Sequence, residues 1–255
     1  MSVFAGSIAG MRYGLDITSV GEWGRPDQIA ELAALAEDHG WDGVFCEDYL
    51  AFPDGGPTYD VWVTLGLVAQ ATTRLTIGTM VTPVPSRHPP TVALQAVSVA
   101  AVSGGRLVLG VGSGDPDGDP VAFDASAPRA ELLEAGLADI RARAPDVPIW
   151  VGGAITKPGP RARALRWDGA CLYRVPPPEW VDVTPDDVAA LRADAGRSSY
   201  VVAVGGRERR GDLTTERAYV AALADAGADW WHEYVPPRLP LDEAKRRIRA
   251  GPIGA

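Results

Sequence analysis

The chain has 255 residues, of which 46% are hydrophobic and 22% charged, and it carries 24 Lys and Arg against 33 Asp and Glu. This is the composition of an ordinary globular protein with one large core, and about 250 residues suffice for a single α/β barrel. The net charge of -9 would repel a nucleic-acid backbone or an anionic lipid surface, so we expect neither as a partner.

The two cysteines, Cys46 and Cys171, are far apart and lie in apolar runs, where Cys usually acts as a small buried hydrophobe. No Cys or His spacing is typical of a zinc site, so no metal is expected. The first residues have neither the positive charge nor the apolar stretch of a signal peptide, and no run approaches the length of a membrane span. These features predict a soluble cytoplasmic protein.

Short apolar runs alternate with segments of helical period along the whole chain. The predicted strands cover residues 11–17, 44–46, 75–81, 106–111, 147–151, 169–173, 200–204 and 229–235. The predicted helices cover residues 26–40, 58–73, 91–102, 131–144, 161–167, 184–196, 214–226 and 241–250. Strict alternation predicts a parallel sheet, and eight such units favour a closed (β/α)8 TIM barrel over a doubly wound sheet. No linker divides the chain, so residues 1–255 are expected to form one domain.

The ends of the predicted strands are rich in glycine, aromatic and acidic residues. In a barrel of this kind the active site lies at the carboxyl ends of the strands. The fourth strand ends in a glycine-rich stretch that includes Gly112, Ser113 and Gly114, followed directly by Asp115. Glycines let a main chain approach a flat or anionic ligand closely, although the same stretch is also typical of a simple turn. No Ser-His-Asp set is present, which favours a flat organic ligand over hydrolysis by a nucleophile.

The fifth strand ends in a second glycine pair with cations downstream. Gly152 and Gly153 lead through Lys157 to Arg161 and Arg163 on a predicted helix. Main-chain N–H groups and cations at such a place are typical of a phosphate site. The alternative is that these cations only form a solvated helix face.

Two longer stretches give a more specific signal. LTIGTMVTPVPSRHPPTVALQ, followed by SGGRLVLGVGSGD, resembles the luciferase-like monooxygenase family. PDQIAELAALAEDHGWDGVFCEDYL, VPIWVGGA and DGACLY add to the likeness, which covers most of residues 12–173. The family contains FMN-dependent monooxygenases and dehydrogenases or reductases that use a deazaflavin, coenzyme F420. The resemblance implies a (β/α)8 barrel with the coenzyme ring at the strand ends and a non-proline cis peptide between Met80 and Val81.

The resemblance also implies roles for acidic residues. Asp48 matches an acidic residue at the end of the second strand, and Tyr49 stands where several deazaflavin enzymes carry a proton-transferring histidine. An ordinary phenol has a pKa of about 10 and is a poor base at neutral pH, so this departure weakens the transfer of that role. Asp115 matches an acidic residue that could bond the ring or a substrate hydroxyl; the alternative is a loop cap.

The eighth strand offers Trp231 and His232 as a wall beside the ring, with His232 either catalytic or structural. The segment 116–129 is short for the family. The substrate is therefore expected to be small, or the site open, or a partner subunit to close it. Homodimerisation is a family-level expectation.

Together these features predict an oxidoreductase that acts on a small organic substrate through FMN or coenzyme F420. The deazaflavin is favoured because Asp48 and Asp115 both match that branch. The alternative is a non-catalytic or degenerate flavin-binding barrel, and a hydrolase using Asp48 and Asp115 as a carboxylate pair is a third hypothesis.

Overall fold

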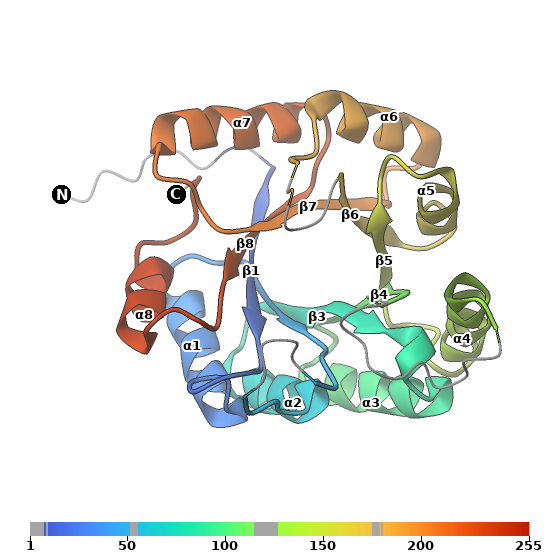
Figure 1. The fold of residues 1–255 in the computed structure, drawn as a ribbon, viewed down its shortest axis with the longest axis horizontal. Coiled ribbons are helices and arrows are strands. Elements are labelled where there is room, and N and C mark those ends of the chain that lie inside the picture. Colours follow the sequence, from blue (N-terminus) through green and yellow to red (C-terminus); the bar gives the residue numbers. More distant parts are fainter. Residues whose placement is uncertain are drawn as a thin grey trace.

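The computed structural model describes residues 8, 10–51, 56–114, 127–174, 179 and 181–254. Its strands pair in chain order, each parallel to its neighbours, and the last strand pairs with the first to close a barrel. The strands are β1 Arg12–Thr18, β2 Gly43–Glu47, β3 Thr76–Pro83, β4 Leu107–Gly112, β5 Ile149–Ala154, β6 Gly169–Tyr173, β7 Val201–Arg207 and β8 Trp230–Val235. Figure 1 shows the helices arranged around this sheet, so the predicted (β/α)8 barrel is confirmed.

One helix follows each strand. The helices are α1 Pro26–Asp38, α2 Val61–Ala71, α3 Pro89–Val102, α4 Arg129–Arg143, α5 Pro158–Ala164, α6 Pro185–Ala195, α7 Leu213–Asp225 and α8 Leu241–Arg249, with a short 3₁₀ turn, η1, at Val84–Ser86. None of the described helices is long and apolar enough to cross a membrane.

The ends of two helices show where sequence signals were sufficient and where they were not. At α6 the predicted range of 184–196 matches the helix with its two cap residues: Thr184 accepts a bond from the Asp187 N–H, and the Asp187 carboxylate accepts one from the Thr184 N–H. At α5 the predicted range of 161–167 was about three residues too late. The helix starts at Pro158, because proline at a first helical position loses no intrahelical hydrogen bond.

The barrel interior holds a separate apolar layer from the one under the helices. Phe45, Trp150 and Trp230 project into it, with ring centroids 5.6 to 5.8 Å apart. Val108 and Ala203 complete this layer, which fills the amino-terminal half of the barrel. Because side chains alternate along a strand, the same inward face continues toward the carboxyl end with other residues.

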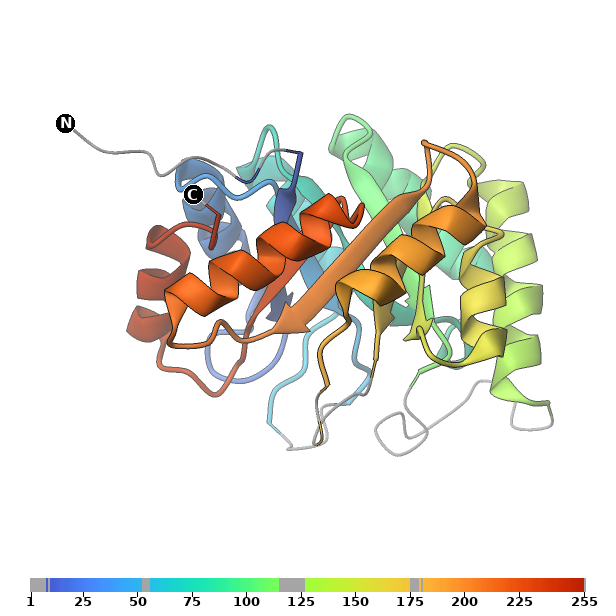
Figure 2. The same cartoon turned by 90° about the horizontal axis from the view of Figure 1, so that it is seen from above.

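The carboxyl ends of the strands lie together on one side of the molecule. The strands are all parallel, and Figure 2 shows their arrows pointing to the same side. The residues that end β2, β3, β4, β5 and β8 are therefore neighbours in space, although they are spread over most of the chain. This end is where the predicted site residues have to be located.

Candidate active site

Beyond the aromatic layer, the inward faces of β1, β2 and β8 become polar. Phe45 and Trp230 point inward, and two positions further along their strands stand Glu47 and His232. Asp16 on β1 faces the same space and meets His232, with its Oδ1 2.8 Å from the imidazole Nδ1. The three adjacent strands thus present carboxyl and imidazole groups to one interior region.

His232 is part of a buried pair in the interior of the barrel. Its side chain is 3% exposed, and its ring lies 4.7 Å from that of Phe45. Gly14 makes room for it, because a Cβ at that position would lie 2.7 Å from the imidazole. The bond to Asp16 leaves the buried Nε2 without a hydrogen-bond partner in the described parts of the chain. That nitrogen is the one imidazole atom left to act on another group.

Glu47 is held by hydroxyl groups from β1 and β8. Thr18 donates its hydroxyl to the Glu47 carboxylate, and the Thr18 Oγ1 lies 3.1 Å from the Tyr234 hydroxyl. Burial raises the pKa of Glu47 to about 7, and the negative charge of Asp16 acts in the same direction. The bonds from Thr18 and Tyr234 act against both. The side chain nevertheless remains partly exposed, so it is an internal acid that solvent or a ligand can reach.

Asp48, the residue after β2, turns out of the interior. Its side chain is fully buried and forms an ion pair with Arg87, which follows η1. Burial raises the pKa of the Asp48 carboxyl, and the Arg87 charge opposes that rise. Its Oδ2 has no hydrogen-bond partner within the described residues. Tyr49 follows with a partly exposed side chain. Asp48 therefore holds the chain after β3 to the end of β2, and a catalytic role for Asp48 or Tyr49 stays a prediction.

The predicted cis peptide between Met80 and Val81 is present, and it is not an X-Pro bond. The pairing of β3 with β4 shifts between Thr79 and Thr82, so the strand is irregular at this point. Both Met80 and Val81 keep partly exposed side chains. The backbone of β3 thus forms a ledge at the barrel mouth, as the family resemblance implied.

The Val81 side chain of this ledge explains why β4 and β5 carry glycines beside it. A Cβ on Gly112 would lie 2.8 Å from Val81 Cγ2, and one on Gly152 would lie 3.2 Å from Val81 Cγ1. The isopropyl group of Val81 therefore fills the space that we had expected a ligand to use. A flat ligand would rest on the Val81 ledge, with Ser113 and Gly114 continuing the main chain beside it. Asp115 lies outside the described residues.

The two predicted cations on α5, Arg161 and Arg163, have carboxylate partners on neighbouring helices. Arg161 pairs with Asp194 of α6 at 2.6 Å, and Arg163 pairs with Glu134 of α4 at 2.8 Å. Lys157 is exposed at the start of α5, close in sequence to Gly152 and Gly153. The assignment of both arginines to a coenzyme anion stays a prediction, and their carboxylate partners compete with it.

Trp231 was wrongly assigned to the ring-facing wall. It is Trp230 that faces the interior, whereas Trp231 packs against Tyr219 of α7, with the ring centroids 5.7 Å apart, and beneath Arg207. The sequence gives the alternation along a strand but not which of two adjacent tryptophans faces inward. Sequence reasoning also missed Asp16 and Thr18, although two polar residues at i and i+2 in a buried strand are a signal for a polar interior face.

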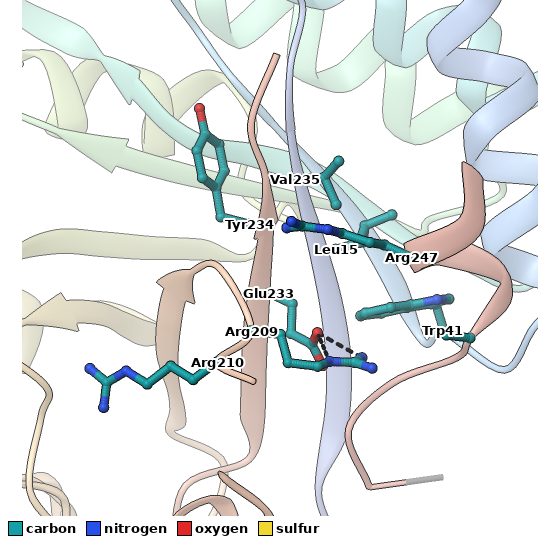
Figure 3. A pocket seen from close by; sticks show the side chains of 9 residues that line it. Leu15, Trp41, Arg209, Arg210, Glu233, Tyr234, Val235 and Arg247 are labelled. Atoms are coloured by element: carbon teal, nitrogen blue, oxygen red, sulfur yellow. Dashed lines mark hydrogen bonds and ion pairs between the residues drawn. The ribbon is translucent and has the colours of Figure 1, made fainter. Parts of the chain in front are cut away.

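A lateral pocket of about 180 Å³ lies between the barrel wall and α8. Figure 3 shows Glu233 pointing to this side of β8, while Tyr234 points the opposite way. The Glu233 carboxylate accepts two bonds from Arg209, at 2.7 and 2.9 Å, and Arg247 pairs with Glu208 at 2.8 Å. Because Arg209 and Arg247 have carboxylate partners within the protein, they offer no surplus charge to an anion in this pocket.

The model of the luciferase-like monooxygenase family matches residues 7–138, which is half of the chain. The chain belongs to the luciferase-like monooxygenase family. The β3 ledge and the glycines of β4 lie within the matched part. The remaining strands close the barrel outside that segment.

Curated relatives in this family cover only part of the chain. An F420-dependent glucose-6-phosphate dehydrogenase of Nakamurella multipartita is 40% identical over 93 residues, which are 35% of this chain and 27% of that protein. An F420-dependent hydroxymycolic acid dehydrogenase of Mycobacterium tuberculosis is 33% identical over 183 residues, 68% of this chain and 47% of that one. These alignments therefore span less than half of either relative.

Among solved structures, the monooxygenase RslO1 from Streptomyces bottropensis superposes with a TM-score of 0.73. The match covers 94% of this chain and 97% of that one at 16% identity. This likeness establishes the shared luciferase-like barrel and nothing about the substrate.

Proposed function

We propose that the protein is a coenzyme F420-dependent oxidoreductase that acts on a small organic substrate at the carboxyl ends of its barrel strands. The observation that carries the proposal is the irregular β3 ledge of Met80 and Val81, which lies at the mouth of a polar interior that contains Asp16, Glu47 and His232. Sequence relatives named as F420-dependent dehydrogenases favour the deazaflavin over FMN.

The described residues fit a flat ring. Val81 closes the space over Gly112 and Gly152, which leaves a surface of main chain and small side chains. Ser113 and Gly114 continue this surface, and Gly153 and Lys157 would hold an anionic group of the coenzyme. When bound, the coenzyme would supply the hydride acceptor or donor, since redox chemistry of this kind belongs to the cofactor.

The polar residues around this surface would act on the substrate. His232 Nε2 is a buried nitrogen without a described partner, which a substrate oxygen could satisfy. Tyr49, whose side chain is partly exposed, would line the side of β2, while Asp48 and its partner Arg87 would fix that end of the strand. Asp115 stays a predicted site residue outside the described part of the chain. These groups would orient a hydroxyl or carbonyl and exclude bulk water from it.

Binding of the two coenzymes tests the proposal directly. Purified protein is titrated with coenzyme F420 and with FMN, and binding is followed by quenching of the fluorescence of each. We expect a Kd in the micromolar range or tighter for F420 and at least tenfold weaker binding of FMN. Tighter binding of FMN, together with oxygen consumption by the reduced protein, would instead identify a flavin monooxygenase. Binding of neither would identify a degenerate barrel.

We also propose that the protein forms a homodimer through α2 and α3. These helices lie side by side (Figure 1) and contain no charged residue. Several of their outward side chains are apolar: Val63 is 58% exposed and Leu94 is 68% exposed. In a chain with a net charge of -9, an uncharged apolar face is where a second copy can approach without repulsion.

Sedimentation of two matched variants tests this interface. We expect Leu94→Lys to convert a dimer into a monomer, because it places a charge in the apolar face. Leu213→Lys, at an exposed leucine of α7, should leave the dimer intact. A wild-type protein that sediments as a monomer would refute the homodimer.

A further inference from the structure

Glu47 occupies the position on β2 that lies next to the cis ledge. The last paired residues of β2 and β3 are Cys46 and Thr79, so Glu47 and Met80 follow side by side. On its other edge, Glu47 pairs in register with Thr18 of β1. Its carboxyl group therefore lies between the ledge and β1, on the inward face that leads to Phe45.

The hydrogen bonds around Glu47 come from Thr18 and Tyr234. Thr18 donates its hydroxyl proton to Glu47, and the Tyr234 hydroxyl, 3.1 Å from Thr18 Oγ1, also bonds to the Glu47 carboxylate. These bonds fix the carboxyl group without neutralising it, since no cation pairs with Glu47 among the described residues. The neighbouring acid is different, because Asp48 is engaged with Arg87.

The groups that face Glu47 come from three strands. Asp16 and Thr18 lie on β1, Tyr234 lies on β8, and Met80 of β3 brings no charge. Burial and Asp16 raise the pKa of Glu47 to about 7, whereas Thr18 and Tyr234 lower it. A general acid or base works best when its pKa lies near the working pH. Glu47 can therefore both accept and release a proton near neutrality.

We propose that Glu47 is the proton-transfer residue of this site, positioned by Thr18 and Tyr234, where the family histidine is replaced by Tyr49. The inference rests on the proposed function. In the direction of oxidation, the O–H bond of a substrate alcohol breaks and its proton passes to the Glu47 carboxylate. The C–H electron pair leaves as hydride to the deazaflavin, and the C=O bond forms. In reduction the protonated carboxyl returns the proton to the carbonyl oxygen.

Infrared titration of the coenzyme-free protein tests the acid itself. The protonated-carboxyl band is measured from pH 5 to 9 in the wild type, Glu47→Gln and Glu31→Gln, the last of which removes an exposed carboxylate from α1. We expect one carboxyl with a midpoint near pH 7 in the wild type and in Glu31→Gln, and its loss in Glu47→Gln. Tyr234→Phe should raise the midpoint, because it removes a bond that stabilises the carboxylate. A band unchanged in Glu47→Gln would overturn the proposal.

Steady-state kinetics tests the transfer. Reduction of coenzyme F420 is followed with propan-2-ol and with glucose 6-phosphate as probes. We expect Glu47→Gln to lower kcat by about 10² to 10⁴ and to abolish the inflection near pH 7, with the coenzyme Kd changed less than about threefold. An unchanged kcat and pH profile in Glu47→Gln would overturn the role of Glu47 alone. A wild type that binds no coenzyme, or reduces none, would overturn the proposed function and the transfer step with it.

Discussion

The two halves of the barrel interior differ although the same strands build both. Toward the amino-terminal ends, Phe45, Trp150 and Trp230 fill the space with packed rings. Two residues further along two of these strands stand Glu47 and His232, which are acidic or titratable and have hydrogen-bond partners on other strands. One layer buries apolar area, while the other holds polar groups whose burial is costly unless they are paired.

This difference separates stability from chemistry along the barrel axis. The aromatic layer stabilises the closed sheet, and it can do so because it has no ligand to admit. The polar layer keeps a raised pKa at Glu47 and a His232 nitrogen that has no hydrogen-bond partner among the described residues. Both are unfavourable for folding and useful for a reaction. Substitutions in the two layers should therefore have different consequences.

The largest effect is expected from Trp230→Ala in the aromatic layer. Trp230 is fully buried, so its removal should cost about 3 to 5 kcal/mol of unfolding free energy through lost burial and a cavity. Urea denaturation of Trp230→Ala measures this cost. Tyr234→Phe, in the polar layer of the same strand, should cost about 1 kcal/mol at most. Equal costs for the two variants would contradict the separation of the layers.

Glu47→Gln should change the pH dependence of stability in the polar layer. Because the folded pKa is raised to about 7, the favourable contribution of Glu47 is complete below pH 4.5 and is lost as the pH rises through 7. At pH 8 the variant should therefore be more stable than the wild type, by up to about 3 kcal/mol, with the gap closing toward pH 5. Thermal unfolding at both pH values measures the gap. A constant difference would show that Glu47 does not titrate in this window.

A double-mutant cycle tests whether Val81 of the ledge occupies the space over Gly112. Gly112→Ala should destabilise the protein by about 1 to 3 kcal/mol and weaken coenzyme binding, because its Cβ would lie 2.8 Å from Val81 Cγ2. Val81→Ala removes that atom, so the double variant should recover much of the stability lost in Gly112→Ala. Unfolding free energies of the four proteins give the coupling. Additive losses would mean that Val81 does not occupy the space over Gly112.

The smallest effect is expected at the rim, outside both layers. Arg161→Ala breaks an ion pair with the half-exposed Asp194, and exposed pairs of this kind contribute about 1 kcal/mol or less. Lys157→Ala should weaken coenzyme F420 binding more than Arg161→Ala, because the guanidinium of Arg161 already has a carboxylate partner. Fluorescence titration of both variants makes the comparison. A larger loss in Arg161→Ala would restore that residue to the anion site.

Most of the fold could be predicted because local patterns decide it. The alternation of apolar runs and helical segments specifies a parallel barrel, and the Thr184 and Asp187 pair specifies the start of α6. The cis bond at Met80–Val81 was implied by likeness to a family and not by any local pattern. The start of α5 was predicted at Arg161 instead of Pro158, because the sequence from Pro158 to Arg161 is compatible with a first helical turn at either residue.

The sequence by itself determined the barrel, the family and the strand ends at which polar groups collect. Only the tertiary structure decided that Trp230 faces inward and that Val81 covers Gly112 and Gly152. It also decided that Glu47 contacts Thr18 and Tyr234, whereas Asp48 pairs with Arg87. The physical reason is that a period of two fixes alternation but not its phase. Contacts between residues more than 200 positions apart arise only when β8 closes against β1.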